Sequence, residues 1–254
     1  MPDIELITTS DGSHSLLNTK LKETYHSVHG AIRESVHVFI KKGLRFFDHL
    51  RHPAEIRILE IGFGTGLNAL LTAQYALESK VRIHYTTLEA YPLEEATVRQ
   101  LNYPALLNVE ASDPKVSGGE APFRPFNPGA PGGLSNPGGP QGLFLKLHAA
   151  SWSDEVMVLN NFTLAKKKIK VQEWSPGREQ FDLVYFDAFS PGKQPEMWEP
   201  SVLKRVEQGM KAGAVFVTYC AKGQLKRDLK SLGLLVETLP GPPGKKEMVR
   251  AVKS

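Results

Sequence analysis

The sequence predicts an α/β protein with a doubly wound, mostly parallel sheet and antiparallel strands at one edge. Three observations predict this fold class. From residue 55 onward, short apolar runs of strand length alternate with segments of helical periodicity. A glycine-rich turn joins the first of these strands to its helix, and the last two apolar runs flank a Gly-Pro-Pro-Gly turn. Alternation with helices produces parallel strands, whereas strands joined by a tight turn pair in antiparallel fashion.

The composition is that of an ordinary globular protein with one large domain, or one domain with an extension. The chain has 254 residues, of which 41% are hydrophobic and 23% are charged, which is enough apolar surface for a real core. The formal net charge is +4 and the sequence pI is about 9.0. This mild basicity permits an acidic partner such as nucleic acid without requiring one.

Several classes of function and location are disfavoured because their signals are missing. Cys220 is the only cysteine, which excludes an intrachain disulfide and a cysteine-based metal cluster and favours the reducing cytoplasm. The eight histidines show no metal-binding spacing, so no metal is expected. No G-x-S-x-G motif of a serine hydrolase is present. The N-terminus does not read as a signal peptide, and no apolar run approaches the roughly 20 residues of a membrane span.

The first half of the chain is expected to hold a strand, a long helix and a βαβ unit. Residues 1–12 alternate weakly and end in a turn, and residues 31–50 place their apolar side chains at helical spacing. The βαβ unit consists of a strand over 55–61, a helix over 67–79, a strand over 81–90 and a further helix over 92–101.

The second half begins with a break in periodicity. Residues 111–142 are dominated by Pro and Gly and are predicted to form a flexible insertion. We expect residues 1–50 to be an N-terminal cap segment and residues 51–254 to be the main domain. After the insertion we expect a strand over 181–186, a helix over 201–210, a strand over 213–220, a helix ending at Gly233 and a closing β-hairpin.

The glycine-rich turn carries the first candidate binding residues. Gly62, Gly64 and Gly66 lie between a strand and a helix, where glycines let the backbone turn sharply and approach a ligand. Their spacing is neither the G-x-G-x-x-G of dinucleotide binders nor a P-loop. Glu60 just before them suits a positively charged or amine-bearing ligand, such as S-adenosylmethionine. The alternative is a tight turn that binds nothing.

A second acid follows at the end of the next strand. Glu89 occupies the place where, in nucleoside-binding α/β folds, a carboxylate accepts the ribose hydroxyls. A strand-end acid alone is also common on exposed surfaces. Two acids and a glycine turn at successive strand ends are much less common, and ligands of open α/β sheets bind at the carboxyl ends of strands. Together these features favour a nucleoside cofactor.

The stretch FDAFSPGKQPEMWEP adds a third acid at a strand end. Asp187 follows the apolar run of residues 181–186 and joins the same crevice. Phe189 and Trp198 can stack on a planar base, and Lys193 can meet a phosphate. The alternative is a core tryptophan, a surface lysine and the start of a helix. Pro191 and Pro195 stiffen this loop.

Two further segments concentrate basic residues. Lys245, Lys246 and Arg250 lie near the C-terminal glycine-rich turn, where they can contact backbone phosphates or simply face solvent. The run LAKKKIK at residues 164–170 is interpreted as a solvated strand edge.

Several stretches of the sequence resemble the tRNA 5-methylaminomethyl-2-thiouridine methyltransferase family, which comprises MnmC N-terminal domains and stand-alone MnmD-like proteins. They are LEIGFGTGLN, LEAYPL, FDAFSPGKQPEMW, VTYCAKGQLKRDL and LPGPPGKKEMVRA, and the segment of residues 25–44 is also similar. The resemblance covers most of the chain outside residues 104–142. It implies a Rossmann-like class I S-adenosylmethionine-dependent methyltransferase fold for residues 51–254. It also implies methylation of the aminomethyl nitrogen on a wobble (2-thio)uridine of tRNA.

The same resemblance implies roles for individual residues. Asp187 is the expected catalytic acid, which accepts a hydrogen bond from the substrate amine and takes its proton. The implied cofactor-binding residues are Glu60, Gly62, Phe63, Gly64, Thr65, Gly66, Asn68, Glu89, Ala90, Gln172 and Asp187, and the implied substrate-binding residues are Glu34, Phe189, Pro191, Lys193, Trp198, Lys245 and Lys246. Gln172 and Glu173 stand where the family tends to place an acid near the adenine. The FAD-dependent oxidase of fused family members is expected on a separate protein.

Two alternative functions stay open on the sequence. The first is another S-adenosylmethionine-dependent enzyme, which methylates a small amine or transfers an aminopropyl group. The second is an RNA-binding module that keeps a vestigial fold. Three acids facing a polyanion argue against the second alternative, because a pure binder has no use for them.

Overall fold

The computed structural model describes residues 4–109 and 139–254. Within these residues, an eight-stranded sheet has the order β10-β11-β9-β8-β4-β5-β7-β6. The five strands from β9 to β7 are parallel to one another, and the C-terminal hairpin continues the sheet in antiparallel pairing. Its strands are β4 Glu55–Ile61, β5 Arg82–Leu88, β6 Glu155–Leu159, β7 Phe162–Lys167, β8 Phe181–Phe186, β9 Met210–Thr218, β10 Leu234–Pro240 and β11 Glu247–Lys253. The predicted fold class is confirmed.

Antiparallel pairing occurs at both edges of this sheet, whereas the sequence predicted it at one edge only. β6 pairs with β7 in antiparallel fashion. Residues 160–161 alone separate the two strands, and so short a connection can only return the chain antiparallel to itself.

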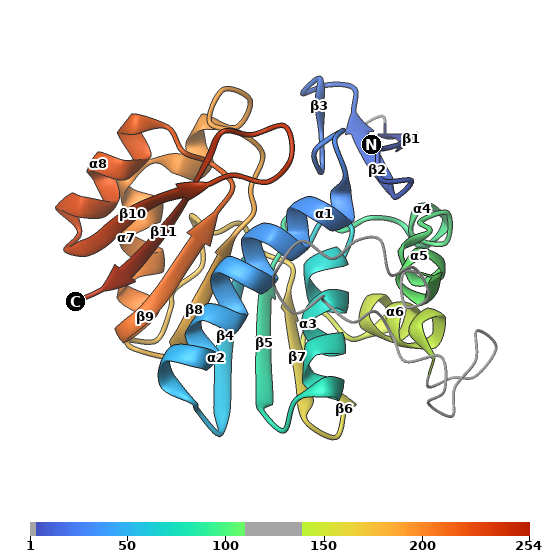
Figure 1. The fold of residues 1–254 in the computed structure, drawn as a ribbon, viewed down its shortest axis with the longest axis horizontal. Helices are drawn as coiled ribbons and strands as arrows, with labels where there is room; N and C mark the ends of the chain where they lie inside the picture. Colours follow the sequence, from blue (N-terminus) through green and yellow to red (C-terminus); the bar gives the residue numbers. More distant parts are fainter. Residues whose placement is uncertain (1–3, 110–138) are drawn as a thin grey trace.

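Helices cover both faces of the sheet (Figure 1). The helix predicted over 31–50 is continuous and has a middle section with π-type hydrogen bonds, and it packs with α3 and α6 on one face. α7 and α8 cover the other face. The helices are α1 Ala31–Ser35, η1 Val36–Arg45, α2 Phe46–Arg51, α3 Leu67–Glu78, α4 Glu95–Val98, α5 Tyr103–Val109, α6 Pro140–Ala149, α7 Pro200–Gly209 and α8 Gly223–Ser231, with a 3₁₀ turn, η4, at Pro195–Trp198.

The long helix shares the core of the sheet. Phe39 is 1% exposed, and its ring lies 5.2 Å from that of Tyr185 on β8. At Gly43, a Cβ atom would lie 2.9 Å from Val217 on β9, so the helix approaches the sheet closely there. Residues before this helix form a separate antiparallel sheet near the carboxyl ends of the main strands, made of β1 Ile4–Thr8, β2 His14–Asn18 and β3 Glu23–Thr24.

Three local predictions differ from the structure. The helix predicted over 92–101 is reduced to the single turn of α4. Most of the predicted insertion lies outside the described residues, but residues 140–142 already belong to α6, whose first turn begins with a proline. Lys166 is 1% exposed and is not part of a solvated strand edge, because its ammonium donates to the His148 oxygen on α6. Within residues 4–109 and 139–254, none of the helices combines the length and apolar character needed to span a bilayer.

Candidate active site

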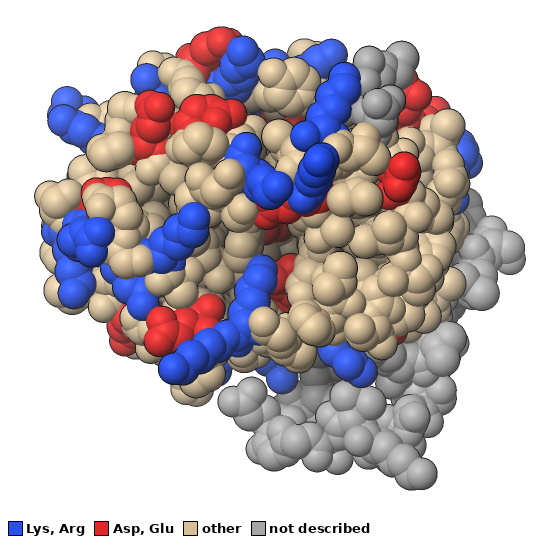
Figure 2. Space-filling view, turned by 90° about the horizontal axis from the view of Figure 1, so that it is seen from above, with Lys and Arg blue, Asp and Glu red and all other residues tan. Residues whose placement is uncertain are grey.

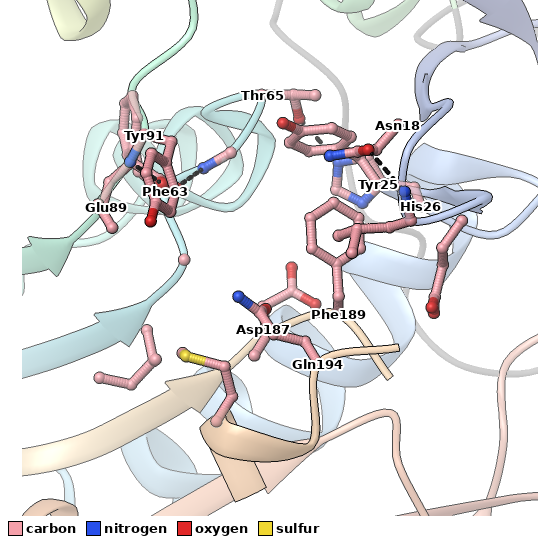
Figure 3. Close-up of a pocket in the computed structure, with 18 of the residues that line it drawn as sticks. Asn18, Tyr25, His26, Phe63, Thr65, Glu89, Tyr91, Asp187, Phe189 and Gln194 are labelled. Carbon is pink, nitrogen blue, oxygen red and sulfur yellow. Dashed lines mark hydrogen bonds between the residues drawn. The ribbon is translucent and has the colours of Figure 1, made fainter. Parts of the chain in front are cut away.

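A cavity of about 920 Å³ lies at the carboxyl ends of β4, β5 and β8 (Figure 3). β4 runs between the other two strands and parallel to both. Two backbone hydrogen bonds join the strand ends: the Gly62 N–H donates to the Leu88 oxygen at 2.9 Å, and the Asp187 N–H donates to the Ile61 oxygen at 3.0 Å. The strands that follow β4 in the sequence are added on both sides of it, β5 and β7 on one side and β8 and β9 on the other. Open α/β sheets bind ligands at such a switch point. The volume suits a nucleoside-sized molecule.

The glycine loop of residues 62–66 forms one wall of this cavity. Gly62 has a φ of 92°, and a Cβ atom there would lie 2.8 Å from the Asp187 carbonyl oxygen. A side chain at Gly62 is therefore excluded both by backbone strain and by contact. The bare loop leaves its main-chain groups accessible to a ligand.

Glu89 is fixed at the end of β5 by two backbone donors. One carboxylate oxygen accepts the Gly64 N–H at 3.0 Å, and the other accepts the Tyr91 N–H at 2.8 Å. A carboxylate offers about four acceptor positions. Glu89 can thus still accept two hydroxyl groups while it holds the glycine loop in place.

Asp187 lies in the cavity wall beside the start of this loop. It accepts a hydrogen bond of 2.8 Å from the Asn68 amide, which orients the carboxylate. Burial, together with the negative charge of Glu34, raises the pKa of Asp187 to about 7, although Asn68 and the cation of Lys245 lower it. A carboxyl group with this pKa can both accept and release a proton near neutral pH.

The tip of the C-terminal hairpin completes the cavity next to Asp187. The Lys245 ammonium pairs with Glu34 and lies 3.7 Å from the centre of the Tyr219 ring. Glu34 is only 5% exposed and also accepts the Ser27 N–H at 2.8 Å. The Tyr219 hydroxyl donates to the Ala188 oxygen at 2.8 Å. Charged groups of both signs therefore surround the carboxylate of Asp187.

The comparisons with known proteins agree with this geometry. Residues 147–254 match the model of a family described as S-adenosyl-L-methionine-dependent methyltransferase. A protein from Idiomarina loihiensis named tRNA 5-methylaminomethyl-2-thiouridine biosynthesis bifunctional protein MnmC is 28% identical over 239 residues, which are 92% of this chain and 36% of that protein. The protein of the same name from Burkholderia thailandensis is 27% identical over 96% of this chain and 34% of its own length. The chain is thus similar to MnmC proteins over nearly its whole length, and residues 147–254 match a family of S-adenosylmethionine-dependent methyltransferases.

A solved structure has the same fold as this methyltransferase. MNMC2 from Aquifex aeolicus superposes with a TM-score of 0.70 at 22% sequence identity, over 99% of this chain and 70% of that chain. The methyltransferase spans about a third of the length of the curated relatives it matches. The resemblance noted from the sequence motifs is confirmed.

The structure brings together most of the residues that the sequence nominated. Those that line the cavity are Glu34, Gly62, Phe63, Gly64, Thr65, Asn68, Glu89, Ala90, Gln172, Asp187, Phe189 and Lys245. Those that do not line it are Glu60, Gly66, Pro191, Lys193, Trp198 and Lys246. Gln172 lines the cavity with its amide N–H already donated to the Glu196 oxygen at 3.1 Å.

Trp198 is a core residue of the methyltransferase and not a stacking platform. It is 7% exposed, its ring lies 4.8 Å from that of Phe186, and its indole N–H donates to the Phe189 oxygen at 2.8 Å. Trp198 therefore supports the loop that carries Phe189.

Other lining residues were not predicted as site residues from the sequence. Tyr25 packs edge-on against Phe189 with ring centres 4.9 Å apart, and His26 follows Tyr25 in the cavity wall. Tyr219 comes directly after β9, so the strand-end rule that found Asp187 also applies to Tyr219. Nothing local distinguishes Tyr25 and His26, which only the packing of the N-terminal segment brings to the cavity.

Glu60 lies beneath the cavity in an unusual ionisation state. It is 0% exposed, and the polar side chains that act on its buried carboxyl group are those of Thr87, Tyr85 and Asn68. Burial, with a smaller contribution from the charge of Asp187, raises the pKa of Glu60 from 4.5 to about 8, against the opposing effect of the Thr87 hydroxyl. Glu60 is therefore mostly protonated at neutral pH in the cofactor-free protein, and it is not among the residues that line the cavity.

The free energy of unfolding of the cofactor-free wild type is expected to fall between about pH 4.5 and about 8, and Glu60→Gln is expected to make this fall smaller. The pKa of Glu60 is higher in the folded protein than in the unfolded chain. Its contribution to the free energy of unfolding is therefore complete below about pH 4.5 and is lost as the pH rises toward about 8. Glutamine keeps the shape without titrating. Urea unfolding across this pH range measures the effect, with the exposed Glu95→Gln variant as a matched control. An unaltered pH slope in Glu60→Gln would contradict the assignment.

Proposed function

We propose that this methyltransferase moves the methyl group of S-adenosylmethionine to the aminomethyl nitrogen of 5-aminomethyl-(2-thio)uridine at the wobble position of tRNA. The observation that carries the proposal is the position of Asp187, a carboxylate with a pKa near 7 in the cavity wall beside the glycine loop. The names of the MnmC relatives support this substrate.

The residues present fit S-adenosylmethionine, which supplies an electrophilic methyl group when bound. Glu89 would accept the ribose hydroxyls with its two remaining acceptor positions. The glycine loop and Asn68 would face the amino-acid part. Leu88, Val171 and Met197 line the cavity and present apolar surface for the adenine ring.

Asp187 would act on the acceptor amine. Methyl transfer needs an uncharged amine whose lone pair points at the methyl group. The carboxylate can accept a hydrogen bond from the amine, orient its lone pair and take its proton. The Asn68 amide holds the carboxylate in one orientation for this task, so positioning contributes as well as proton transfer.

The mouth of the cavity suits a polyanionic substrate that carries a planar base. Lys20, Lys170 and Lys245 are among its lining residues, and Figure 2 shows Lys and Arg side chains around a hollow with acidic atoms inside it. Cations at the rim would contact phosphates, while the acids inside face the amine. The edge-packed rings of Tyr25 and Phe189 offer a surface for the flipped uracil.

One experiment tests donor, acceptor and reaction together. The purified protein is incubated with methyl-labelled S-adenosylmethionine and tRNA from cells that lack this methylation, and the labelled nucleoside is identified after digestion. Label in 5-methylaminomethyl-(2-thio)uridine is expected, and Asp187→Asn should incorporate it at least about 100-fold more slowly. Absence of label in tRNA, with cofactor binding demonstrated separately, would contradict the proposal. Label in an added small amine would instead favour a small-molecule methyltransferase.

A further inference from the structure

Two buried histidines contact the same residue of the glycine loop from opposite sides. His26, in the N-terminal segment, has its Nε2 atom 2.7 Å from the Thr65 hydroxyl (Figure 3). His148, on α6, has its Nε2 atom 3.1 Å from the Thr65 carbonyl oxygen. Thr65 itself is 1% exposed, so its hydroxyl and its carbonyl oxygen bond to protein groups instead of water. The Tyr103 hydroxyl also acts on the Thr65 hydroxyl.

Both histidines are uncharged at neutral pH. Burial lowers the pKa of His26 to about 4, with Glu34 and Asp11 opposing this effect and Lys245 adding to it. Burial lowers the pKa of His148 to about 4 as well, with the Thr65 carbonyl opposing and Lys166 adding to the effect. Because a carbonyl oxygen only accepts, Nε2 of neutral His148 carries the hydrogen.

The surroundings hold the His148 ring in one place. It packs between Phe144 and Phe63, with ring centres 4.7 and 5.1 Å away. The buried Lys166 ammonium donates to the His148 carbonyl oxygen and lies 4.4 Å from the centre of the Trp152 ring. At Gly66, a Cβ atom would lie 2.6 Å from His148 Nε2. The third glycine of the motif therefore makes room for a histidine and does not itself line the cavity.

We propose that His26 and His148 are positioning residues that hold the glycine loop in its cofactor-binding conformation, each through Thr65. The inference rests on the cofactor site proposed for this loop. Neither histidine is assigned a chemical step. The cofactor affinity then depends on two segments far from the loop in sequence, because each supplies one hydrogen bond that fixes a residue of the cavity wall.

Leucine and glutamine variants of each histidine separate hydrogen bonding from packing. Glutamine places its amide nitrogen near the position of histidine Nε2 and still donates, whereas leucine fills the space without a polar group. We expect His148→Leu and His26→Leu to weaken S-adenosylmethionine binding about 3- to 10-fold, the equivalent of one neutral hydrogen bond. His148→Gln and His26→Gln should bind S-adenosylmethionine within about 2-fold of the wild type, because the amide restores the hydrogen bond to Thr65.

The measurement is calorimetric titration of S-adenosylmethionine without tRNA, with circular dichroism to verify folding. Val206→Ala on α7 is the control, because it removes buried volume on the other face of the sheet without touching the loop. A double-mutant cycle adds Thr65→Val, which keeps the shape and removes the hydroxyl. If His26 acts through that hydroxyl, His26→Leu should weaken binding no further in the Thr65→Val background.

Two outcomes overturn the inference: leucine variants that bind like the wild type, or glutamine variants that bind as weakly as leucine. If His26→Leu does not fold, Thr65→Val decides in its place, since unchanged affinity there removes the role of His26. If His148→Leu does not fold, His148→Gln decides, since an affinity more than about 2-fold below the wild type removes the role of the His148 hydrogen bond. Failure of this inference is distinct from failure of the proposed function. If the wild type binds the cofactor but methylates no tRNA, the proposed function fails and the role of the two histidines stands. If the wild type methylates tRNA but the leucine variants bind the cofactor like the wild type, the role of the histidines fails and the proposed function stands.

Discussion

Asp187→Asn is expected to lower kcat by at least about 100-fold, the usual contribution of a general base, while the dissociation constant of S-adenosylmethionine changes little. Asparagine keeps the size of the side chain, and its carbonyl oxygen can still accept the hydrogen bond from the Asn68 amide. It carries no negative charge and takes no proton. Chemistry is therefore lost with the cavity otherwise preserved.

Single-turnover methylation of tRNA with saturating cofactor measures the chemical step directly. Asp182→Asn on β8, the strand that leads to Asp187, is a matched control, because Asp182 pairs with Lys211 at 2.8 Å and does not line the cavity. Turnover of Asp187→Asn near the wild-type rate would remove Asp187 from the mechanism. An equal loss in Asp182→Asn would point to the fold of β8 as the cause.

Glu89→Gln is expected to weaken S-adenosylmethionine binding about 10- to 100-fold, because it removes charge-assisted hydrogen bonds to hydroxyl groups. It also disturbs the protein itself. The two carboxylate oxygens accept the N–H groups of Gly64 and Tyr91, and an amide group has only one oxygen for these two donors. One donor at the cavity wall loses its acceptor, and the glycine loop is released on that side.

Titration calorimetry gives the affinity, and steady-state rates at saturating cofactor give kcat. We expect the dissociation constant to change and kcat to be affected much less, since Glu89 contacts no reacting atom. Glu95→Gln, an exposed glutamate on the nearby α4, serves as the control. Wild-type affinity in Glu89→Gln would show that the carboxylate does not hold the ribose.

The sequence alone was sufficient for the strand and helix pattern that defines the fold class. Apolar periodicity predicts β4, α3 and β5 because each is a local amphipathic or buried segment. It also placed Glu89 and Asp187 at strand ends, and parallel strands put their carboxyl ends at one edge. These predictions needed no knowledge of which strands are neighbours.

The residues that surround Asp187 could not be predicted in the same way. Lys245 was nominated as a phosphate contact, but its pairing with Glu34 and its position on Tyr219 join three segments far apart in sequence. Tyr25 and His26 reach the cavity only because the N-terminal segment packs over the carboxyl end of the sheet. Such contacts depend on non-local packing, which leaves no periodic signal in the chain.

Burial is the second property that only the tertiary structure decided. From the sequence, Glu60 is expected to contact the cofactor, Trp198 to stack on a nucleobase and Lys166 to face solvent. All three side chains are instead buried. The layers on both sides of the sheet shield these side chains from water. Burial keeps the carboxyl group of Glu60 protonated, and the Trp198 indole and the Lys166 ammonium donate to backbone oxygens. The sequence by itself determined which elements form and which acids stand at their ends. The packing of those elements decided which side chains meet the ligand, because a residue's exposure depends on neighbours that its own segment does not specify.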